Sequence, residues 1–522
     1  MGRVNLLSGS YKAKSVIANY QRRVNLYPEK NPDSTQAPVP VTHYPTPGIT
    51  KIADPPTPGM GRGIYEASTG DCYAVIGSNV YYIAPNYRFI LLGHVSQNNN
   101  IVRMSDNGIE LMIVDGSSKG YTIDLTTRVF SIITDPNFYG SNTVDYADTY
   151  FLLGRPRTNQ WYISLSNSSA FDPLDLAAKT GAPDPVTAVV ALHREVWLIG
   201  AYTTEIWYDS GAADFAYAAM PGAMIEHGCL APYSVIKIDV GIFWLSHDKQ
   251  GHRMVLMGTP YTAARVSNHA IEAEFNTYAY VNDAVAYSYQ LEGHVFYVLS
   301  FPSADKTWVY DLSTSEWHEW NWMDNDGVLH RHRGVVGANP YDTNLILDWE
   351  TGTLYKIDPT RYTDNGQPIV RIAGLPHVSS NGDKSQHRQL TVDIEVGTST
   401  DGGPTTELQF QGNIGAGPVD LNFFGFDYPT NNVYGQIHWN RVEGDYTIQG
   451  KPPMISMRWS DTKGHSWGNW LMQSMGWPGE YLTTVSFNRL GIGRDRVYEL
   501  SWSEPVKTAL NGVWLEFTKL ES

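Results

Sequence analysis

The sequence predicts an all-β protein: a β-propeller of six or seven blades with an extended N-terminal arm and a smaller C-terminal β domain. Two observations predict it, namely an aromatic strand phrase that recurs at regular intervals and turn residues that bound its copies. The phrase is an apolar strand, a short polar turn and an aromatic-rich strand that often ends in Asp. Its copies are Tyr81–Ile83, Tyr121–Asp124, Trp161–Ile163, Ile206–Asp209, Trp308–Leu312 and Leu354–Asp358.

The spacing of these copies is typical of propeller blades. The markers Ile83, Ile123, Ile163, Tyr208, Tyr310 and Ile357 are separated by 40, 40, 45, 102 and 47 residues. The gap of 102 leaves room for one further copy near Arg253–Met257. A four-stranded sheet of about 40 to 50 residues cannot bury both faces alone, so its copies pack radially against one another. Evenly spaced hairpins in another all-β fold are the alternative, although a sandwich uses closer turn signals.

Turn chemistry and proline content divide the chain into segments. Asn107-Gly108 and Asp115-Gly116 supply turn residues that tolerate positive φ. We assign residues 1–58 to the arm, 59–375 to the propeller and 376–522 to the C-terminal domain, with an inserted loop at 397–452. The arm carries nine prolines between Pro28 and Pro58, which disfavour a helix or a central strand. One helix is predicted inside the propeller, with Ser267 capping residues 268–275.

Composition and charge restrict the function. Of 522 residues, 42% are apolar and 17% are charged, which predicts a folded protein with large neutral surfaces. The formal charge is −16, yet residues 1–30 carry +5, so the remainder carries −21. An acidic body argues against gripping nucleic acid, because binding requires clustered Lys and Arg. The basic arm could dock on an acidic partner or be a solvated terminus.

Cysteine content and hydropathy exclude further classes. Cys72 and Cys229 are the only cysteines and lie in separate predicted blades, so we expect two buried, reduced thiols rather than a disulfide framework or a metal pair. There is no stretch of eighteen apolar residues, and the N-terminus lacks the apolar run of a signal peptide. We therefore expect synthesis in the cytoplasm and no membrane insertion.

Motifs that could carry chemistry are few. Ser460, Asp461, Gly464, Ser466 and Trp467 resemble an Asp-box, a hairpin turn of sialidase-type propellers that is structural and remote from catalysis, here with Thr462 at the usual third-position Asp. His330-x-His332 could bind a metal from one strand face, but the basic Arg331 and Arg333 beside it disfavour a cation, so we expect surface histidines.

Two further patterns fail on spacing. Asp324–Gly327 lacks the carboxylates of a calcium loop and is a turn, and Gly491–Arg496 breaks the dinucleotide fingerprint. The sequence therefore predicts no catalytic, metal or cofactor residues, and no cofactor.

Three stretches together resemble a known family. They are Arg23–Glu29 with Tyr44–Ile49 and Arg62-Gly63; Thr204–Tyr208 with Ser267 and Ala270–Glu272; and Arg458–Asp461 through His465–Gly468, Asn488–Gly491 and Arg494–Val497. In this order and spacing, they are similar to the packaged-DNA stabilisation proteins, or tail nozzle proteins, of short-tailed bacteriophages (podoviruses).

That resemblance implies a non-enzymatic virion protein assembled in the host cytoplasm. The family's protein is a homohexameric tube beneath the portal and the tail adaptor ring. It closes the portal–tail channel, retains the packaged DNA, conducts the genome during ejection without sequence-specific binding, and carries a tailspike or tail fibre nearby. Candidate assembly contacts are Arg22, Arg23, Arg489, Arg494 and Arg496. A carbohydrate-binding or sialidase-like propeller adhesin, and a scaffolding propeller for cellular partners, remain alternatives.

Overall fold

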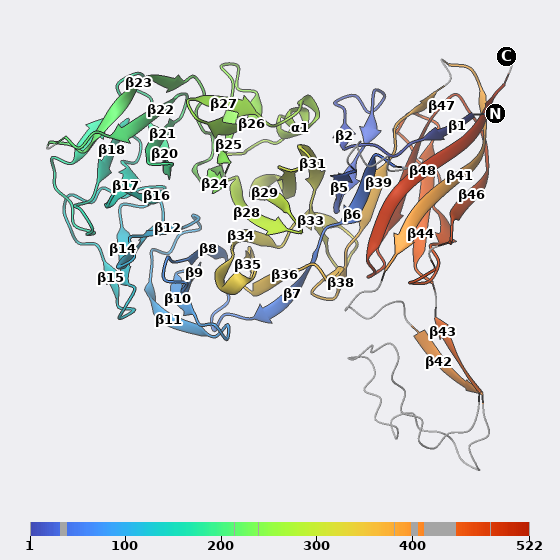
Figure 1. The fold of residues 1–522 in the computed structure, drawn as a ribbon, viewed down its shortest axis with the longest axis horizontal. Helices are drawn as coiled ribbons and strands as arrows, with labels where there is room; N and C mark the ends of the chain where they lie inside the picture. Colours follow the sequence, from blue (N-terminus) through green and yellow to red (C-terminus); the bar gives the residue numbers. More distant parts are fainter. Residues whose placement is uncertain are drawn as a thin grey trace, which may run out of the picture. The chain divides into compact units, whose positions relative to one another are not determined.

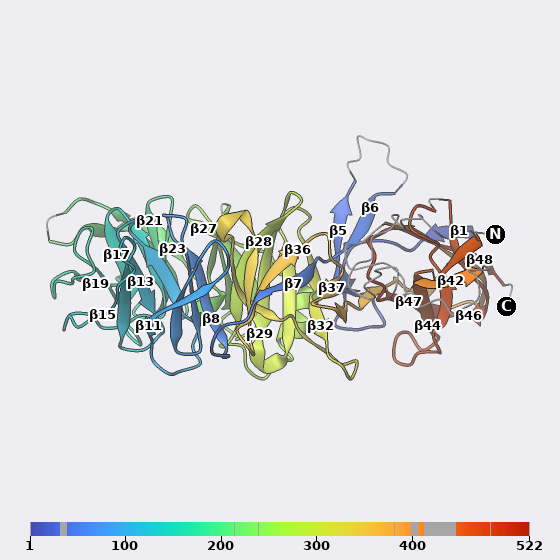
Figure 2. The same cartoon turned by 90° about the horizontal axis from the view of Figure 1, so that it is seen from below.

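The computed structural model describes residues 2–31, 39–212, 214–238, 240–379, 382–397, 406–411, 445–450, 452–480 and 482–520. These residues form an all-β structure with one short α-helix, which confirms the predicted fold class (Figures 1 and 2). Contacts divide the chain into two compact units. The propeller unit comprises Lys51–Asn321 and His330–Ile357, and the sandwich unit comprises Met1–Thr50, Trp322–Leu329 and Asp358–Ser522.

The described part of the propeller unit contains seven four-stranded blades, which follow one another round a ring (Figure 1). Five blades are separate sheets, whereas the sixth and seventh are parts of larger sheets. In the first six blades, each strand pairs antiparallel with the next strand in the chain. These six blades are β8 to β11 (Gly61–Glu66, Cys72–Ile76, Asn79–Ile83, Phe89–His94), β12 to β15 (Arg103–Asp106, Glu110–Val114, Gly120–Asp124, Phe130–Ile132), β16 to β19 (Val144–Ala147, Tyr150–Gly154, Gln160–Ile163, Leu176–Ala178), β20 to β23 (Val186–Leu192, Glu195–Gly200, Thr204–Asp209, Tyr217–Ile225), β24 to β27 (Ile236–Ile238, Gly241–His247, Arg253–Thr259, Thr262–Arg265) and β28 to β31 (Val285–Leu291, His294–Phe301, Lys306–Asp311, Glu316–Glu319).

The seventh blade closes the ring with strands from both ends of the propeller sequence. It is ordered β34 (Gly334–Ala338), β35 (Leu345–Asp348), β36 (Leu354–Asp358) and β7 (Gly48–Ala53). Ile52 of β7 packs against a buried cluster shared by the first and seventh blades. Just beyond β7, Asp54 accepts a hydrogen bond of 2.9 Å from the Thr353 hydroxyl. These contacts join residues about 300 positions apart and complete a seven-bladed propeller.

Each blade buries both of its faces against its neighbours. In β9, Cys72, Ala74 and Ile76 pack into the cluster shared with the seventh blade. The alternate residues Tyr73 and Val75 pack into the cluster shared with the second blade. Because side chains alternate across a strand, a strand between two blades must be apolar at every position. This explains why the blade strands show continuous apolar runs.

The aromatic phrase of the sequence corresponds to the third strand of each blade. Its copies fall on β10, β14, β18, β22, β30 and β36, and the additional copy expected near Arg253–Met257 is β26. The recurrent Asp closes the turn that follows. The Asp124 Oδ1 atom accepts hydrogen bonds from the backbone N–H groups of Thr126 (3.0 Å) and Thr127 (2.6 Å), as a short carboxylate does in an Asx turn.

The predicted helix exists, but its cap is one residue later than expected. Helix α1 spans His269–Phe275, and the Asn268 side chain caps it by accepting from the Ile271 N–H group at 3.0 Å. The Ser267 hydroxyl instead donates to Glu272 at 2.7 Å and accepts from the Val255 N–H group at 2.9 Å. Asn and Ser are equally good caps, so propensity alone could not choose between them.

The sandwich unit has two main sheets around one apolar core. The first is ordered β46 (Val485–Gly493), β41 (Ser385–Val396), β48 (Thr508–Lys519), β6 (Val41–Pro45), β5 (Leu26–Lys30), with β1 (Gly2–Asn5) also on β48. The second contains β4 (Arg23–Val24), β39 (Arg371–Gly374), β47 (Asp495–Trp502), β44 (Met454–Ser460) and β45 (Leu471–Ser474), with β40 (Val378–Ser379) on β47. Leu390 and Leu515 from one sheet and Met457 and Leu500 from the other share a buried cluster.

The remaining described elements are short. They are the strand pairs β2 (Tyr11–Lys12) with β3 (Tyr20–Gln21), β37 (Thr363–Asp364) with β38 (Gln367–Pro368) and β42 (Thr406–Gln411) with β43 (Asp445–Gly450), the strands β32 (Asn321–Met323) and β33 (Leu329–Arg331), and the 3-10 turns Pro232–Ser234, Pro302–Ala304 and Pro340–Asp342. Apart from β42 and β43, most of the predicted insertion 397–452 lies outside the described residues. Within the described chain, α1 is far too short to cross a bilayer.

The observed boundaries differ from the predicted ones at both ends of the propeller. The propeller unit begins at Lys51 and ends at Ile357, rather than spanning 59–375. Residues 1–50 are not a separate arm, because they contribute strands to the sandwich unit. Pro28 fits into β5 because β5 is the last strand of its sheet and pairs with β6 alone. An edge strand does not need every N–H group for pairing, so it tolerates proline.

Candidate functional site

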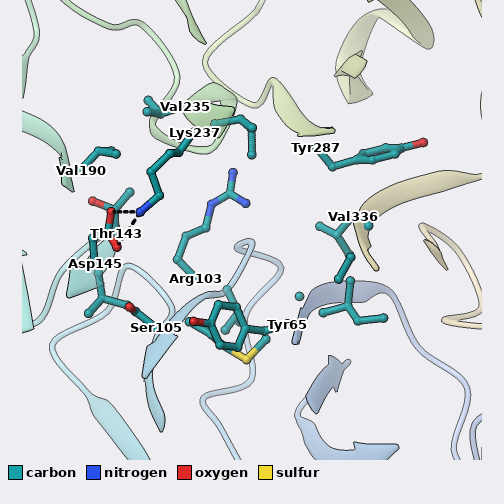
Figure 3. Close-up of a pocket in the computed structure, with 18 of the residues that line it drawn as sticks. Tyr65, Arg103, Ser105, Thr143, Asp145, Val190, Val235, Lys237, Tyr287 and Val336 are labelled. Atoms are coloured by element: carbon teal, nitrogen blue, oxygen red, sulfur yellow. Dashed lines mark hydrogen bonds and ion pairs between the residues drawn. The ribbon is translucent and has the colours of Figure 1, made fainter. Parts of the chain in front are cut away.

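A cavity of about 360 Å³ lies at the centre of the propeller unit (Figure 3). The first strand of every blade lines it, so all seven blades contribute. Much of the wall is apolar, and its valines are Val102, Val144, Val189, Val190, Val235 and Val336. β-Branched side chains suit this position because they pack well on a pleated surface. The ring geometry therefore brings residues more than 270 positions apart to one pocket.

One guanidinium group, that of Arg103 in β12, lies in the middle of this cavity (Figure 3). Its Nη2 atom donates a hydrogen bond to the backbone carbonyl of Tyr233. Burial lowers the pKa of Arg103 to about 10, although the rings of Tyr233 and Tyr297 oppose the shift. The group is still positively charged at neutral pH, so the cavity contains a cation beside a wall of mixed polarity.

An ion pair between two blades also lines the cavity. The Lys237 ammonium of β24 lies 3.0 and 3.2 Å from the two carboxylate oxygens of Asp145 of β16 (Figure 3). The lysine side chain is about half exposed, at 46%, and the aspartate is 17% exposed. This ion pair joins two non-adjacent blades, and it neutralises the carboxylate locally.

Tyr287 of β28 fills the wall beside two glycines of β34. A Cβ atom added at Gly337 would lie 2.8 Å from the Tyr287 ring. One added at Gly334 would lie 3.2 Å from the Tyr287 hydroxyl. Burial raises the pKa of Tyr287 above its ordinary value. The glycines thus make room for the ring, and larger residues there would displace it.

The size of the cavity limits what it can accept. A volume of 360 Å³ corresponds to a cube with an edge of about 7 Å, whereas the major groove of B-DNA alone is about 12 Å wide. Duplex DNA therefore cannot pass along the propeller axis. The volume is within the range of about 300 to 1,000 Å³ found for small-molecule sites. The lining residues include no His or Cys, and no group of metal-ligating side chains occurs among the residues that the structure describes.

The five Asp-box residues form the turn that follows β44. The Ser460 hydroxyl accepts hydrogen bonds from the N–H groups of Thr462 (3.2 Å) and Gly464 (2.8 Å). Thr462, which replaces the usual Asp, accepts from the Ser466 N–H group at 2.7 Å. The Trp467 ring packs 5.1 Å from the Tyr20 ring. The hydrogen bonds stabilise the turn itself, the ring contact joins it to Tyr20, and Asp461 points instead to Arg496.

Two of the five arginines proposed as assembly contacts are buried in their own chain, which corrects that prediction. Arg23 is 1% exposed and donates from Nε to His43 at 3.0 Å and from Nη2 to the Ser8 carbonyl at 2.8 Å. Arg496 is 2% exposed and binds Asp461 at 2.7 Å. Their charges are used to stabilise the sandwich unit, because buried guanidinium groups require partners.

The other three arginines lie nearer the surface. Arg22 is half-buried, whereas Arg489 and Arg494 are exposed. Arg494 donates from Nη1 to the Gly382 carbonyl at 2.6 Å. These three remain predictions as assembly contacts.

The prediction that His330 and His332 lie at the surface is correct for His330 only. His330 binds Asp305 at 2.7 Å and is partly exposed. His332 is fully buried, contrary to the surface position predicted for it, and its ring stacks on Trp320 at 3.7 Å. Cys72 and Cys229 are free, buried thiols, as predicted.

Sequence reasoning missed the cavity residues altogether. It used the aromatic third strands as markers, whereas the cavity is made by the first strands. A charged residue in the first strand of a blade, as in Arg103, Asp145 and Lys237, was the available signal. Without the ring closure, nothing in the sequence connects these three positions.

Comparison with known families decides the relationship. The family described as "Bacteriophage P22 Gp10, beta-propeller", of the phage-stabilisation type, matches residues 3–362, which is more than half of the chain. The chain belongs to this bacteriophage β-propeller family. The match includes all seven blades, and it ends before the C-terminal stretch that also resembled the family.

No curated protein matches the chain. Among solved structures, similar chains include the Myceliophteria_thermophila Cps50 (Swd1) β-propeller domain, the N-terminal domain of Nup159 and BamB from Moraxella catarrhalis. Their identities are 8%, 8% and 11%, and their TM-scores are 0.39, 0.37 and 0.31. The alignments cover 59%, 64% and 60% of this chain and 98%, 98% and 99% of theirs.

Proposed function

We propose that this protein is a structural component of the virion of a short-tailed bacteriophage. In this proposal, it forms the tail nozzle, a homohexameric ring that closes the portal–tail channel, retains the packaged DNA and conducts the genome during ejection. The observation that carries the proposal is the family match over residues 3–362. The ring would bind the tail adaptor ring on one side and a tailspike or tail fibre nearby.

The central cavity supports a passage between subunits rather than through them. The propeller axis is too narrow for duplex DNA, so a genome channel must be formed by several copies around a common axis. The propeller unit is also acidic, with 18 Lys and Arg against 31 Asp and Glu. Like charge would repel DNA phosphates within a Debye length of about 8 Å at physiological salt. Such a wall would let the genome move without adhering.

An exposed apolar edge strand supplies a candidate contact for self-assembly. Strand β45 is the last strand of its sheet and pairs with β44 alone. Trp470, Leu471 and Met472 at its start are 41%, 39% and 59% exposed. Edge strands with exposed apolar side chains favour pairing with another chain, and in a homo-oligomer the other chain is a second copy of this protein. We therefore place one subunit contact at β45.

Reconstitution with the neighbouring rings tests the proposed function. The purified full-length protein is mixed with portal and adaptor rings of its own phage and examined by sedimentation and negative-stain microscopy. We expect a six-fold tube at the adaptor. A protein that stays apart from the rings at stoichiometric concentration would contradict the proposal.

Charge placed on β45 should weaken self-assembly. The double variant Leu471→Glu/Met472→Glu would place two like charges per subunit at the contact, so we expect its assembly on adaptor rings to require at least tenfold more protein. Sedimentation velocity over a concentration series measures this. The matched control is Ile132→Glu, which changes a 53% exposed apolar residue in a propeller edge strand. Equal assembly of both variants would remove β45 from the interface.

The carbohydrate-active alternative finds little support in the site. A sialidase-type site needs several arginines that converge on one carboxylate, and the central cavity is lined by Arg103 alone among arginines. Incubation of the purified protein with host-surface glycans tests this alternative, since a nozzle should neither bind nor release sugars.

A further inference from the structure

The central guanidinium of the propeller has a charge that the described protein does not neutralise. The cavity has two lining carboxylates, Glu66 and Asp145. Asp145 is bound to Lys237 at 3.0 Å, and no ion pair joins Arg103 to any carboxylate among the residues that the structure describes. Burying a charge without a partner is costly, and natural proteins pair such groups. An unpaired, half-buried cation that lines a pocket therefore points to a ligand of opposite charge.

The geometry also leaves hydrogen-bond donors for that ligand. A guanidinium has five N–H donors, and the structure gives Arg103 one hydrogen bond, to the Tyr233 carbonyl. Figure 3 shows the guanidinium projecting into the cavity from β12, with Lys237 on the neighbouring wall. Planar guanidinium groups match the oxygens of carboxylates and phosphates in a two-pronged arrangement.

We propose that the central cavity binds one small anion with a phosphate or carboxylate group, and that Arg103 is its principal ligand. The volume of about 360 Å³ admits an ion of this size and excludes a nucleic-acid strand. The valines make part of the wall apolar, which strengthens the electrostatic attraction beside them. Because all seven first strands line the cavity, the anion stabilises the closed ring. This inference does not depend on the nozzle function.

Thermal unfolding in the presence of defined anions tests the site. The full-length protein is dialysed into phosphate-free buffer and titrated with inorganic phosphate or, separately, malonate, with chloride keeping the ionic strength constant. We expect one of these anions to raise the Tm of the wild type, by about 5 °C at a hundredfold excess over Kd. Arg103→Met should abolish that shift. Arg88→Met, which changes an exposed arginine of the first blade, should retain it. The anion that gives the larger shift identifies the head group.

Two results would overturn the proposal. One is a wild-type protein that responds to neither anion, and the other is an Arg103→Met protein that responds as strongly as the wild type. Because Arg103→Met also removes the hydrogen bond to the Tyr233 carbonyl, Arg103→Lys provides a second test by titration calorimetry. The lysine keeps the charge and loses the planar fork, so we expect about one anion per chain in the wild type and at least tenfold weaker binding in the variant. Equal affinity would exclude Arg103 as the ligand.

Discussion

Replacing Arg62 with alanine is expected to destabilise the propeller unit by about 3 to 5 kcal/mol, the usual cost of breaking a buried ion pair. The side chain is fully buried and donates to the backbone carbonyls of Asn100 (2.6 Å), Gly77 (2.8 Å) and Ser96 (3.0 Å). It also lies 3.7 Å from the carboxylate of Asp115, which is equally buried. The substitution would leave that carboxylate without its cation and would remove the guanidinium donor from three carbonyls, of which, within the described chain, only that of Ser96 keeps another donor, the Asn98 N–H group.

Urea denaturation followed by tryptophan fluorescence measures this loss. The control is Arg88→Ala, in which an exposed arginine of the same blade is removed and the change should stay within about 0.5 kcal/mol. A second variant, Asp115→Asn, keeps the shape and removes the charge, so its loss should be smaller than that of Arg62→Ala. If Arg62→Ala unfolds at the wild-type urea concentration, the buried network does not hold the first two blades together.

The propeller could be predicted because the sequence pattern of the third strand repeats from blade to blade. Each third strand carries apolar and aromatic residues, since blades press on both of its faces, and four of these strands end in the Asp of a turn, at Asp124, Asp209, Asp311 and Asp358. Those local requirements recur in every blade, so the sequence shows them as a period. The number of blades could not be predicted in the same way, because the seventh blade includes strand β7. The partner strand of β7 lies about 300 residues away, so their pairing leaves no local pattern in the sequence.

The candidate site and the fate of the N-terminal segment could not be predicted, because both depend on long-range contacts. Arg23 appeared to be a surface charge next to Arg22, but its partners His43 and Ser8 are brought to it only when β4 to β6 join the sandwich sheets. Arg103 appeared to be one charge in a blade strand. It becomes a site only because seven first strands meet at one axis.

His332 was misassigned because the arginines on both sides of it were taken to disfavour a metal cation, and a surface position was then expected. In the structure, Arg331 and Arg333 lie over the Trp349 ring at 4.2 and 5.3 Å, and Arg333 binds Asp348 at 2.7 Å. The intervening histidine points to the opposite face of the chain and is buried, as strand alternation requires. Guanidinium groups that stack on aromatic rings do not indicate a solvent-exposed strand.

That burial makes the propeller sensitive to mild acid. His332 is completely buried against Trp320, and its Nδ1 atom accepts a hydrogen bond of 3.2 Å from the Gly334 N–H group, which requires an unprotonated nitrogen. Burial, with a smaller contribution from the charge of Arg333, lowers the pKa of His332 to about 3. Burial likewise lowers the pKa of His318 to about 4.

Because the pKa values of both histidines are lowered in the folded protein, acid destabilises the fold. Above pH 6.5 the histidines are neutral in both the folded and the unfolded chain, so their contribution to stability is complete. As the pH falls below 6.5, the unfolded chain binds protons that the folded chain cannot, and stability is lost until the pH reaches the folded pKa. Each unit of pH costs about 1.4 kcal/mol per histidine, so between pH 6.5 and 5.0 we expect each of the two to remove about 2 kcal/mol.

The variant His332→Gln isolates this contribution. Glutamine keeps an acceptor for the Gly334 N–H group and does not titrate, so the stability lost between pH 6.5 and 5.0 should be about 2 kcal/mol smaller than in the wild type. Urea midpoints at pH 7.5, 6.5, 5.5 and 5.0 provide the measurement, and this window lies above the range in which the buried carboxylates protonate. His94→Gln is the control, because its side chain is exposed and contacts the neutral Asn79 amide, and this variant should keep the wild-type slope. A His332→Gln protein with the wild-type slope would show that acid sensitivity arises elsewhere in the chain.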